Sequence, residues 1–144
     1  GFSHLQRAQR ASTLTRWHLM AGIAAEHATA PTYEQTDWAT IASWYEQLVA
    51  LDPSAAPRLG HAIALAEGGT AAEALRRLQA LLPQAPAALQ AHTWAALARA
   101  HERLDQIEQA VCSLDRAIAC ARHAADGRLL QRRRDTLAVR LHTS

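Results

Sequence analysis

Histidine and cysteine are the side chains of this sequence that could bind a metal ion, and the chain has eight histidines and two cysteines. Structural zinc sites space their cysteines two to four residues apart, and zinc-binding helices of metalloproteases carry two histidines four residues apart, with a glutamate after the first. The histidines of the central and C-terminal parts of the chain are scattered and follow neither pattern: His61, His92, His101 and His123. We therefore expect no metal site and no cofactor.

Cys112 and Cys120 lie eight residues apart within one expected helix. At a rise of 1.5 Å per residue their Cα atoms would be about 12 Å apart, which is too far for a disulfide bond between them. His123 could share a side of that helix with both, but the short cysteine spacing of a zinc site is missing. We expect both cysteines to be free and to serve as small, buried or half-buried apolar residues, as in the reducing cytoplasm.

Nucleophilic catalysis and phosphate binding have recognisable glycine-containing motifs, and neither occurs here. The sequence has no Gly-x-Ser-x-Gly and no glycine-rich loop after an expected strand. The carboxylates fall mostly at helix ends or at expected exposed positions, where solvation accounts for them: Glu67, Glu73, Glu102, Asp105 and Glu108. We therefore expect that the chain is not an enzyme; an enzyme fragment or small-ligand binder remains a third interpretation beside the two given below.

A run of arginines marks the last expected helix: Arg128, Arg132, Arg133, Arg134 and Arg140. Our interpretation is a solvated face that caps the fold, with local ion pairs such as Arg134 with Asp135. The alternative is a surface for an acidic partner or a nucleic acid, although no aromatic residues interleave with the arginines. The four tryptophans lie on apolar stripes of their helices and are expected in the core: Trp17, Trp38, Trp44 and Trp94.

The elements that would position these residues are helices. Nearly half of the 144 residues are apolar, alanine and leucine dominate, and these residues have high helix propensity. A net charge of +2 does not by itself indicate a nucleic acid or an anionic membrane, and no apolar run is long enough to span a membrane. The length predicts one domain over residues 1–144, and the composition makes it all-α. The start at Gly1 suggests a fragment of a longer protein.

Apolar residues recur every three or four positions in stretches separated by proline, glycine and capping residues. Thr36, Ser54 and Thr70 are expected N-caps, and prolines or the Gly68-Gly69 pair end most of the helices. The short linkers predict antiparallel hairpins. The expected helices, seven or eight in number, cover approximately 3–12, 15–29, 37–51, 55–67, 71–82, 87–104, 107–120 and 126–141.

The sequence repeats at an interval of 36 residues, which relates Ala62 to Ala98, Ala74 to Ala110 and Leu78 to Leu114. The unit over residues 91–124 resembles the tetratricopeptide repeat. The signature positions of that repeat are occupied here by Trp94, Leu97, Ala98, His101, Ala110, Leu114 and Ala117. Arg122 stands where that family usually has proline. The preceding copy is degenerate, with Arg58 and His61 in the tryptophan and leucine places. The resemblance implies a right-handed superhelical stack of antiparallel hairpins.

In that family the first helix of each hairpin faces the concave wall, where partners bind. For the unit over 91–124, the resemblance places His92, Arg99, Glu102 and Arg103 there, together with Ala95. These side chains mix charges without a deep apolar slot. We expect a polar contact with a protein at this face.

Residues 21–67 carry a narrower resemblance, in the order Ala21-Gly-Ile-Ala-Ala-Glu-His-Ala-Thr-Ala-Pro31, Thr36-Asp-Trp38, Leu51-Asp-Pro53 and Ala62-Ile-Ala-Leu-Ala-Glu67. These phrases resemble the C-terminal, tetratricopeptide-like extension of extracytoplasmic-function RNA polymerase sigma factors, although Gly60-His61 and Ile63 depart from the usual residues. The resemblance implies a regulatory domain that modulates transcription initiation in the bacterial cytoplasm.

Its expected partners are core RNA polymerase or the sigma regions of the same protein. DNA would be bound only by regions absent from this chain, and no membrane is involved. A general tetratricopeptide adaptor unrelated to transcription is the alternative.

Overall fold

The computed structural model describes residues 4–30 and 35–143 and, among their side chains, those of 15–28, 30 and 35–142. The described residues form seven α-helices and one short 3-10 helix, without a β-strand, so the predicted all-α class is confirmed. The elements are α1 (His4–Thr29), α2 (Trp38–Leu51), α3 (Ala55–Glu67), α4 (Ala71–Leu81), η1 (Leu82–Gln84), α5 (Ala87–Arg103), α6 (Ile107–Cys120) and α7 (Ala124–Thr143).

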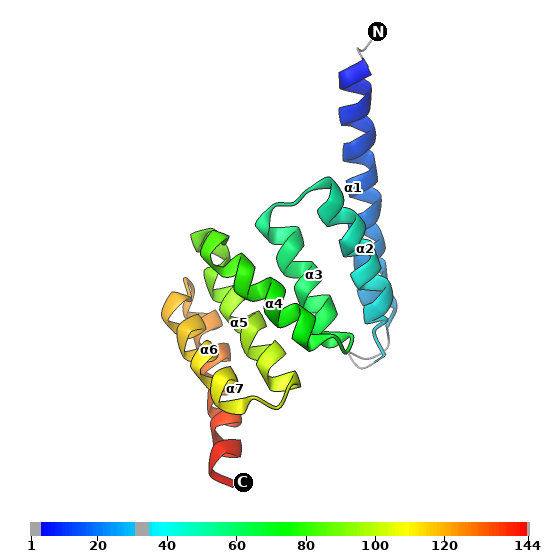
Figure 1. Ribbon diagram of the computed structural model, residues 1–144. Coiled ribbons are helices and arrows are strands. Elements are labelled where there is room, and N and C mark those ends of the chain that lie inside the picture. The colour runs from blue at the N-terminus through cyan, green and yellow to red at the C-terminus, as the bar shows by residue number, and fades with distance from the viewer. Residues whose placement is uncertain (1–3, 31–34, 144) are drawn as a thin grey trace.

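α1 is a single helix of 26 residues, although the sequence predicted two helices over 3–12 and 15–29. That prediction is wrong because Ser12 and Thr13 only lower the helix propensity. Proline or a C-terminal glycine would have ended the helix. At 1.5 Å per residue α1 is about 39 Å long, whereas the 14-residue α2 is about 21 Å. The first half of α1 accordingly extends beyond the rest of the molecule (Figure 1).

Local capping chemistry is clearest at the start of α2 and the end of α3, whereas the N-cap side chains of α3 to α6 form no capping hydrogen bond. Asp37, rather than the expected Thr36, is the N-cap of α2, and its carboxylate accepts a hydrogen bond from the Thr40 backbone N–H at 3.1 Å. This bond and one from the Thr40 hydroxyl lower the pKa of Asp37. α3 ends at Glu67 with Gly68 as its C-cap, and Gly69 then adopts a φ of 99°, which glycine reaches without strain.

Each helix packs against the next one along the chain, and α3 also packs directly against α5. Figure 1 shows the resulting row of helices, with the N-terminus at one end and the C-terminus at the other. α4 packs on both α3 and α5, and α6 packs on both α5 and α7.

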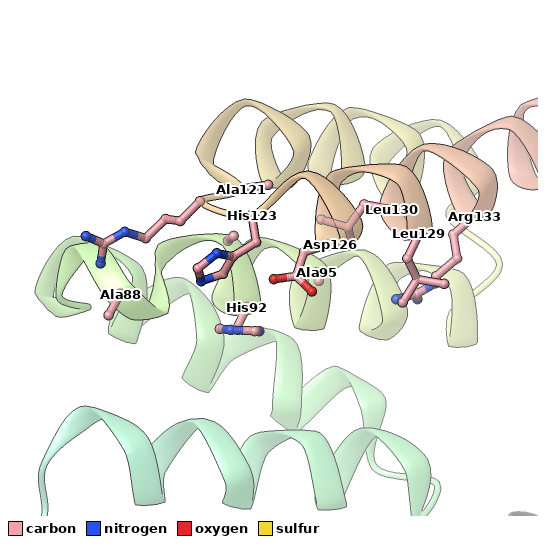
Figure 2. A pocket seen from close by; sticks show the side chains of 11 residues that line it. Ala88, His92, Ala95, Ala121, His123, Asp126, Leu129, Leu130 and Arg133 are labelled. Atoms are coloured by element: carbon pink, nitrogen blue, oxygen red, sulfur yellow. The ribbon is translucent and has the colours of Figure 1, made fainter.

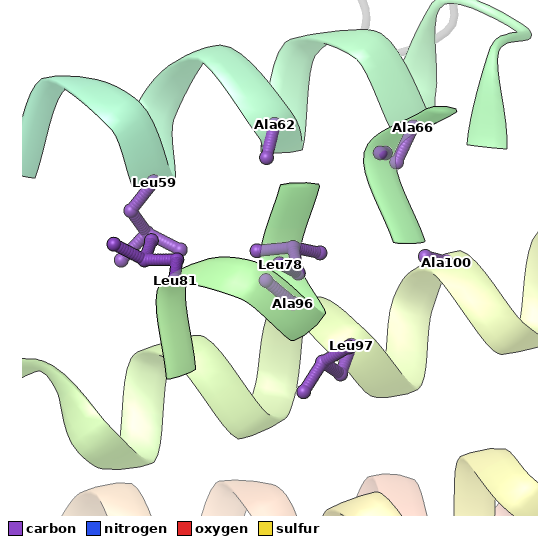
Figure 3. Packing of buried hydrophobic residues seen from close by; sticks show 9 residues of the cluster. Leu59, Ala62, Ala66, Leu78, Leu81, Ala96, Leu97 and Ala100 are labelled. Carbon is purple, nitrogen blue, oxygen red and sulfur yellow. The ribbon is translucent and has the colours of Figure 1, made fainter. Parts of the chain in front are cut away.

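One cluster of buried apolar residues lies between α3, α4 and α5. Figure 3 shows Leu59, Ala62 and Ala66 of α3 facing leucines of α4 and small residues of α5. All six residues related by the 36-residue interval are fully buried: Ala62, Ala98, Ala74, Ala110, Leu78 and Leu114. Alanine lets the helix axes approach closely, and the leucines beside it fill the remaining space. The interval thus marks positions with the same packing role in both copies.

Two glycines allow close approach between neighbouring helices at the N-terminal end of the fold. A side chain at Gly60 of α3 would overlap the aromatic ring of Tyr45 on α2. At Gly22 of α1, a Cβ atom would lie 3.0 Å from the Trp44 ring. None of the described helices is both long and apolar enough to cross a lipid bilayer.

Candidate functional site

The four residues predicted to bind a partner, His92, Arg99, Glu102 and Arg103, all lie on α5. His92, Arg99 and Glu102 line a shallow groove of about 490 Å³, which we call the central groove. Its other walls are Ile63 and Glu67 of α3, Ala95 and Ala96 of α5, and Arg133 of α7. Arg103 is at the edge of this arrangement. Contact of these residues with a partner stays a prediction.

Glu67 is buried, with 4% of its side chain exposed, so the expectation of a solvated carboxylate is wrong at this position. The reason is a partner 32 residues away: the Arg99 Nε donates to Oε1 of Glu67 at 2.7 Å, and Nη2 donates to Oε2 at 3.3 Å. Arg99 also pairs with Glu102 at 3.1 Å. Arg103 donates to the backbone carbonyl of Glu67 at 3.3 Å. Three of the four predicted residues thus belong to one network that joins α5 to α3.

The network fixes the charge of Arg99. Hydrogen bonding to the Glu67 carboxylate raises the pKa of Arg99 far above its ordinary value, against the opposing effect of partial burial, and Glu102 adds to the rise. A two-point guanidinium–carboxylate pair is among the stronger and more directional contacts in proteins. Because both of its anchors are internal, Arg99 mainly holds α3 and α5 in register.

A second groove, about 650 Å³ in volume, lies between α5 and α7, and we call it the α5–α7 groove. Its α5 wall carries alanines on one face of the helix, Ala88, Ala91 and Ala95, whose side chains are too short to fill the space. Figure 2 shows His92 facing His123 and Asp126 across the groove, with Leu129 and Arg133 further along α7. Ala121, Arg122 and Leu130 complete the lining.

The polar groups of the α5–α7 groove are exposed or half-exposed. It is lined by two guanidinium groups, those of Arg122 and Arg133, and by a single carboxylate, Asp126. Within the described part of the chain, neither arginine forms an ion pair. The groove therefore combines an apolar, small-residue wall with cationic side chains that face solvent.

A largely apolar groove at the N-terminal end of the molecule was not expected from the sequence. Trp17 and Met20 of α1 are 72% and 60% exposed, so the expected burial of Trp17 is wrong. Among the side chains of α1 that the structure describes, 15–28, Leu19 and Ile23 are the buried apolar ones, and they pack on α2. Trp17 and Met20 border a groove of about 670 Å³, which we call the α1–α3 groove. Its lining also includes Ile23, Ala24, His27, Tyr45, Leu48, Ala56 and Pro57, with Arg16, Asp52 and Ser54 as polar residues.

The apolar stripe in the sequence gave only an ambiguous signal for this groove. Positions 17, 20, 23 and 24 lie within about one third of a helical turn of each other, but so do 19 and 23. Which of these faces packs against α2 depends on residues of α2, not on α1. The other three tryptophans are half-buried and pack against the cores as expected: Trp38, Trp44 and Trp94.

No group of three or more potential metal ligands forms among the described residues. Both cysteines are free, and Cys120 is half-buried as predicted, but Cys112 is exposed because it lies on the side of α6 away from the core. His61 is buried between α3 and its neighbours, and this burial lowers the pKa of its imidazole, with the nearby charge of Arg77 adding to the effect.

The arginines of α7 divide between internal pairs and open surface. Arg134 contacts Asp115 of α6 at 2.9 Å and, more distantly, the predicted partner Asp135 at 3.7 Å. Arg140 pairs with Asp105 in the turn before α6 at 3.1 Å. These contacts tie the last helix to the preceding hairpin through rather exposed pairs, each of which stabilises the fold only slightly.

Compared with protein-family models, with curated proteins and with solved structures, the chain has no significant match.

Proposed function

We propose that this chain is a tetratricopeptide-like stack of helical hairpins and that it works by binding another protein. The equal burial of the residue pairs 36 positions apart supports two structurally equivalent hairpins, α3–α4 and α5–α6. Direct packing of α3 on α5 is the neighbour relation that such a stack requires. In this proposal the stack curves as a right-handed superhelix, and α7 caps its C-terminal end.

The observation that carries a protein-binding function is the α1–α3 groove. Trp17 and Met20 are large apolar side chains that lie mostly in water beside other apolar groups, which is unfavourable unless a partner covers them. Tryptophan is enriched among the residues that contribute most to protein interfaces, and methionine adapts its shape to a partner. We therefore place the main contact surface here rather than at Arg99 and Glu102.

For the partner, we propose the sigma regions of an extracytoplasmic-function sigma factor or core RNA polymerase, so that the chain regulates transcription initiation in the bacterial cytoplasm. The support is the resemblance of residues 21–67, which span the last third of α1, together with α2 and α3. These are the helices that line the α1–α3 groove. The proposal requires that sigma regions be encoded upstream of Gly1 in the same gene.

A pull-down with the immobilised chain tests both parts of the proposal. Purified core RNA polymerase and the separately expressed upstream sigma regions are offered to the chain and to a variant with Trp17→Ser and Met20→Ser. Both substituted side chains are exposed, so the helix should remain folded. A matched control carries Val139→Ser and Leu141→Ser, which remove exposed apolar residues from α7.

We expect capture of one of the two partners by the chain and by the α7 control, and loss of capture by the α1 variant. Equal capture by all three proteins would show that the α1–α3 groove is not the contact surface. Retention of neither transcription component, together with specific binding of an unrelated protein through Trp17 and Met20, would favour the general adaptor instead. Circular dichroism of each variant confirms that the helices are intact.

A further inference from the structure

The α5–α7 groove is a second candidate surface, at the opposite end of the chain from the exposed tryptophan. Trp17 lies on α1, whereas this groove is formed by α5, α7 and the turn before α7. Its alanine wall leaves a hollow of about 650 Å³, which is large enough for several side chains of a bound segment. Leu129, which borders the hollow, is 53% exposed.

The charges of the groove determine what kind of segment fits. Arg122 and Arg133 present two guanidinium groups, and the imidazoles of His92 and His123 add further N–H donors. The only carboxylate in the lining is Asp126. The free surface thus offers more donors and positive charge than acceptors and negative charge, which favours a negatively charged occupant.

From this charge complementarity we propose that the α5–α7 groove binds an acidic peptide segment that carries a bulky apolar side chain. The apolar side chain lies on the alanines of α5 and on Leu129, where it replaces water in the hollow. Carboxylates on either side of it accept hydrogen bonds from Arg122 and Arg133, since guanidinium groups bind carboxylates with good geometry. This inference deepens the proposed protein-binding function and depends on it, but uses a different surface.

Synthetic peptides test the proposal directly on the full chain. The probe is a fluorescein-labelled peptide of eight residues, with two glutamates flanking a leucine in a glycine–serine background. One control peptide has lysines in place of the glutamates, and another has serine in place of the leucine. Binding is followed by fluorescence anisotropy at low and at moderate NaCl concentration, because exposed charge pairs weaken as salt screens them.

Protein variants then locate the binding surface. Arg122→Glu with Arg133→Glu should weaken binding of the acidic probe about tenfold or more, because two favourable pairs become repulsive. Arg128→Glu with Arg132→Glu changes the net charge equally at exposed arginines of α7 that do not line the groove. This control should weaken binding less than about threefold. Asp126→Asn removes the one opposing carboxylate and should strengthen binding.

The proposal is overturned if the lysine peptide binds as tightly as the glutamate peptide, or if both double variants lose binding equally. Equal binding of the leucine and serine peptides would likewise exclude the alanine hollow as an apolar subsite. The pull-down through Trp17 and Met20 is a separate measurement. Failure of the peptides with retained capture rejects the α5–α7 groove alone, whereas loss of capture with retained peptide binding rejects the α1–α3 contact alone.

Discussion

Replacing Arg99 with methionine tests whether the Glu67–Arg99 pair holds α3 against α5. Methionine keeps most of the apolar stem of the arginine but removes the guanidinium group, so packing changes little. The Glu67 carboxylate, with 4% of its side chain exposed, would lose hydrogen bonds of 2.7 and 3.3 Å. The perturbation therefore leaves a buried charge without its partner.

The size of the effect follows from the burial of the two groups. Removing one partner of a fully buried ion pair costs about 3–5 kcal/mol. Arg99 is 33% exposed, so water can partly replace it, and we expect a loss of about 2–3 kcal/mol. For a chain of this length each kcal/mol shifts the melting temperature by about 3–4 °C, so the Tm should fall by roughly 6–12 °C.

Thermal unfolding followed by circular dichroism, together with urea unfolding, measures this loss. The matched control is Arg76→Met, which removes an arginine from an exposed pair on α4 and should change stability much less. In a double-mutant cycle, Glu67→Gln in the Arg99→Met background should recover about 1 kcal/mol, because a neutral amide is easier to bury than an unpaired carboxylate. Additive losses from the two changes, or an Arg99→Met effect no larger than that of the control, would refute the reasoning.

The remaining predictions concern the stability of the fold. Gly60→Ala should destabilise the fold by about 1–2 kcal/mol, because the added methyl group would overlap the aromatic ring of Tyr45. Gly127→Ala adds a methyl group that meets only ordinary van der Waals contact, so it should stabilise α7 by about 0.5–1 kcal/mol. Urea unfolding measures both changes. Burial lowers the pKa of the His61 imidazole, so on acidification the unfolded chain binds a proton at this residue at a higher pH than the folded chain does. The contribution of neutral His61 to the free energy of unfolding is therefore complete above the unfolded pKa of about 6.5 and is lost as the pH falls toward the folded pKa. His61→Gln should flatten the measured dependence of stability on pH. Ala74→Leu and Ala110→Leu should each cost about 1–3 kcal/mol by overpacking, and costs that differ widely would contradict equivalent packing in the two hairpins.

The sequence predicted the helices best where local chemistry decides them. Gly68 and Gly69 end α3, and Pro83 and Pro86 separate α4 from α5, because backbone conformation and missing N–H groups act within a few residues. The four alanines that the 36-residue interval relates are all fully buried, since small residues are needed wherever two helix axes approach. These signals are either local or periodic.

The candidate site was less predictable because its geometry depends on contacts between distant helices. Glu67 sits at the end of an amphipathic helix, where a carboxylate is ordinarily solvated, and only the position of Arg99, 32 residues later, allows its burial. Trp17 and Met20 share a helix stripe with Ile23, and the sequence of α1 does not show which side α2 covers. Side-chain type and spacing thus predicted the helices, but not which of their polar side chains pair with one another within the fold.

This division between engaged and free side chains determines how the surface can be tested. Reversing the charge of Arg99 would disrupt the contact between α3 and α5 before it could report on a partner, because the buried Glu67 carboxylate would then face a second, partly exposed carboxylate. Neither Trp17 nor Arg133 belongs to any of the described salt bridges, so substituting them leaves those salt bridges intact. A loss of partner binding at these positions can therefore be attributed to the surface itself, provided that the melting temperature is unchanged.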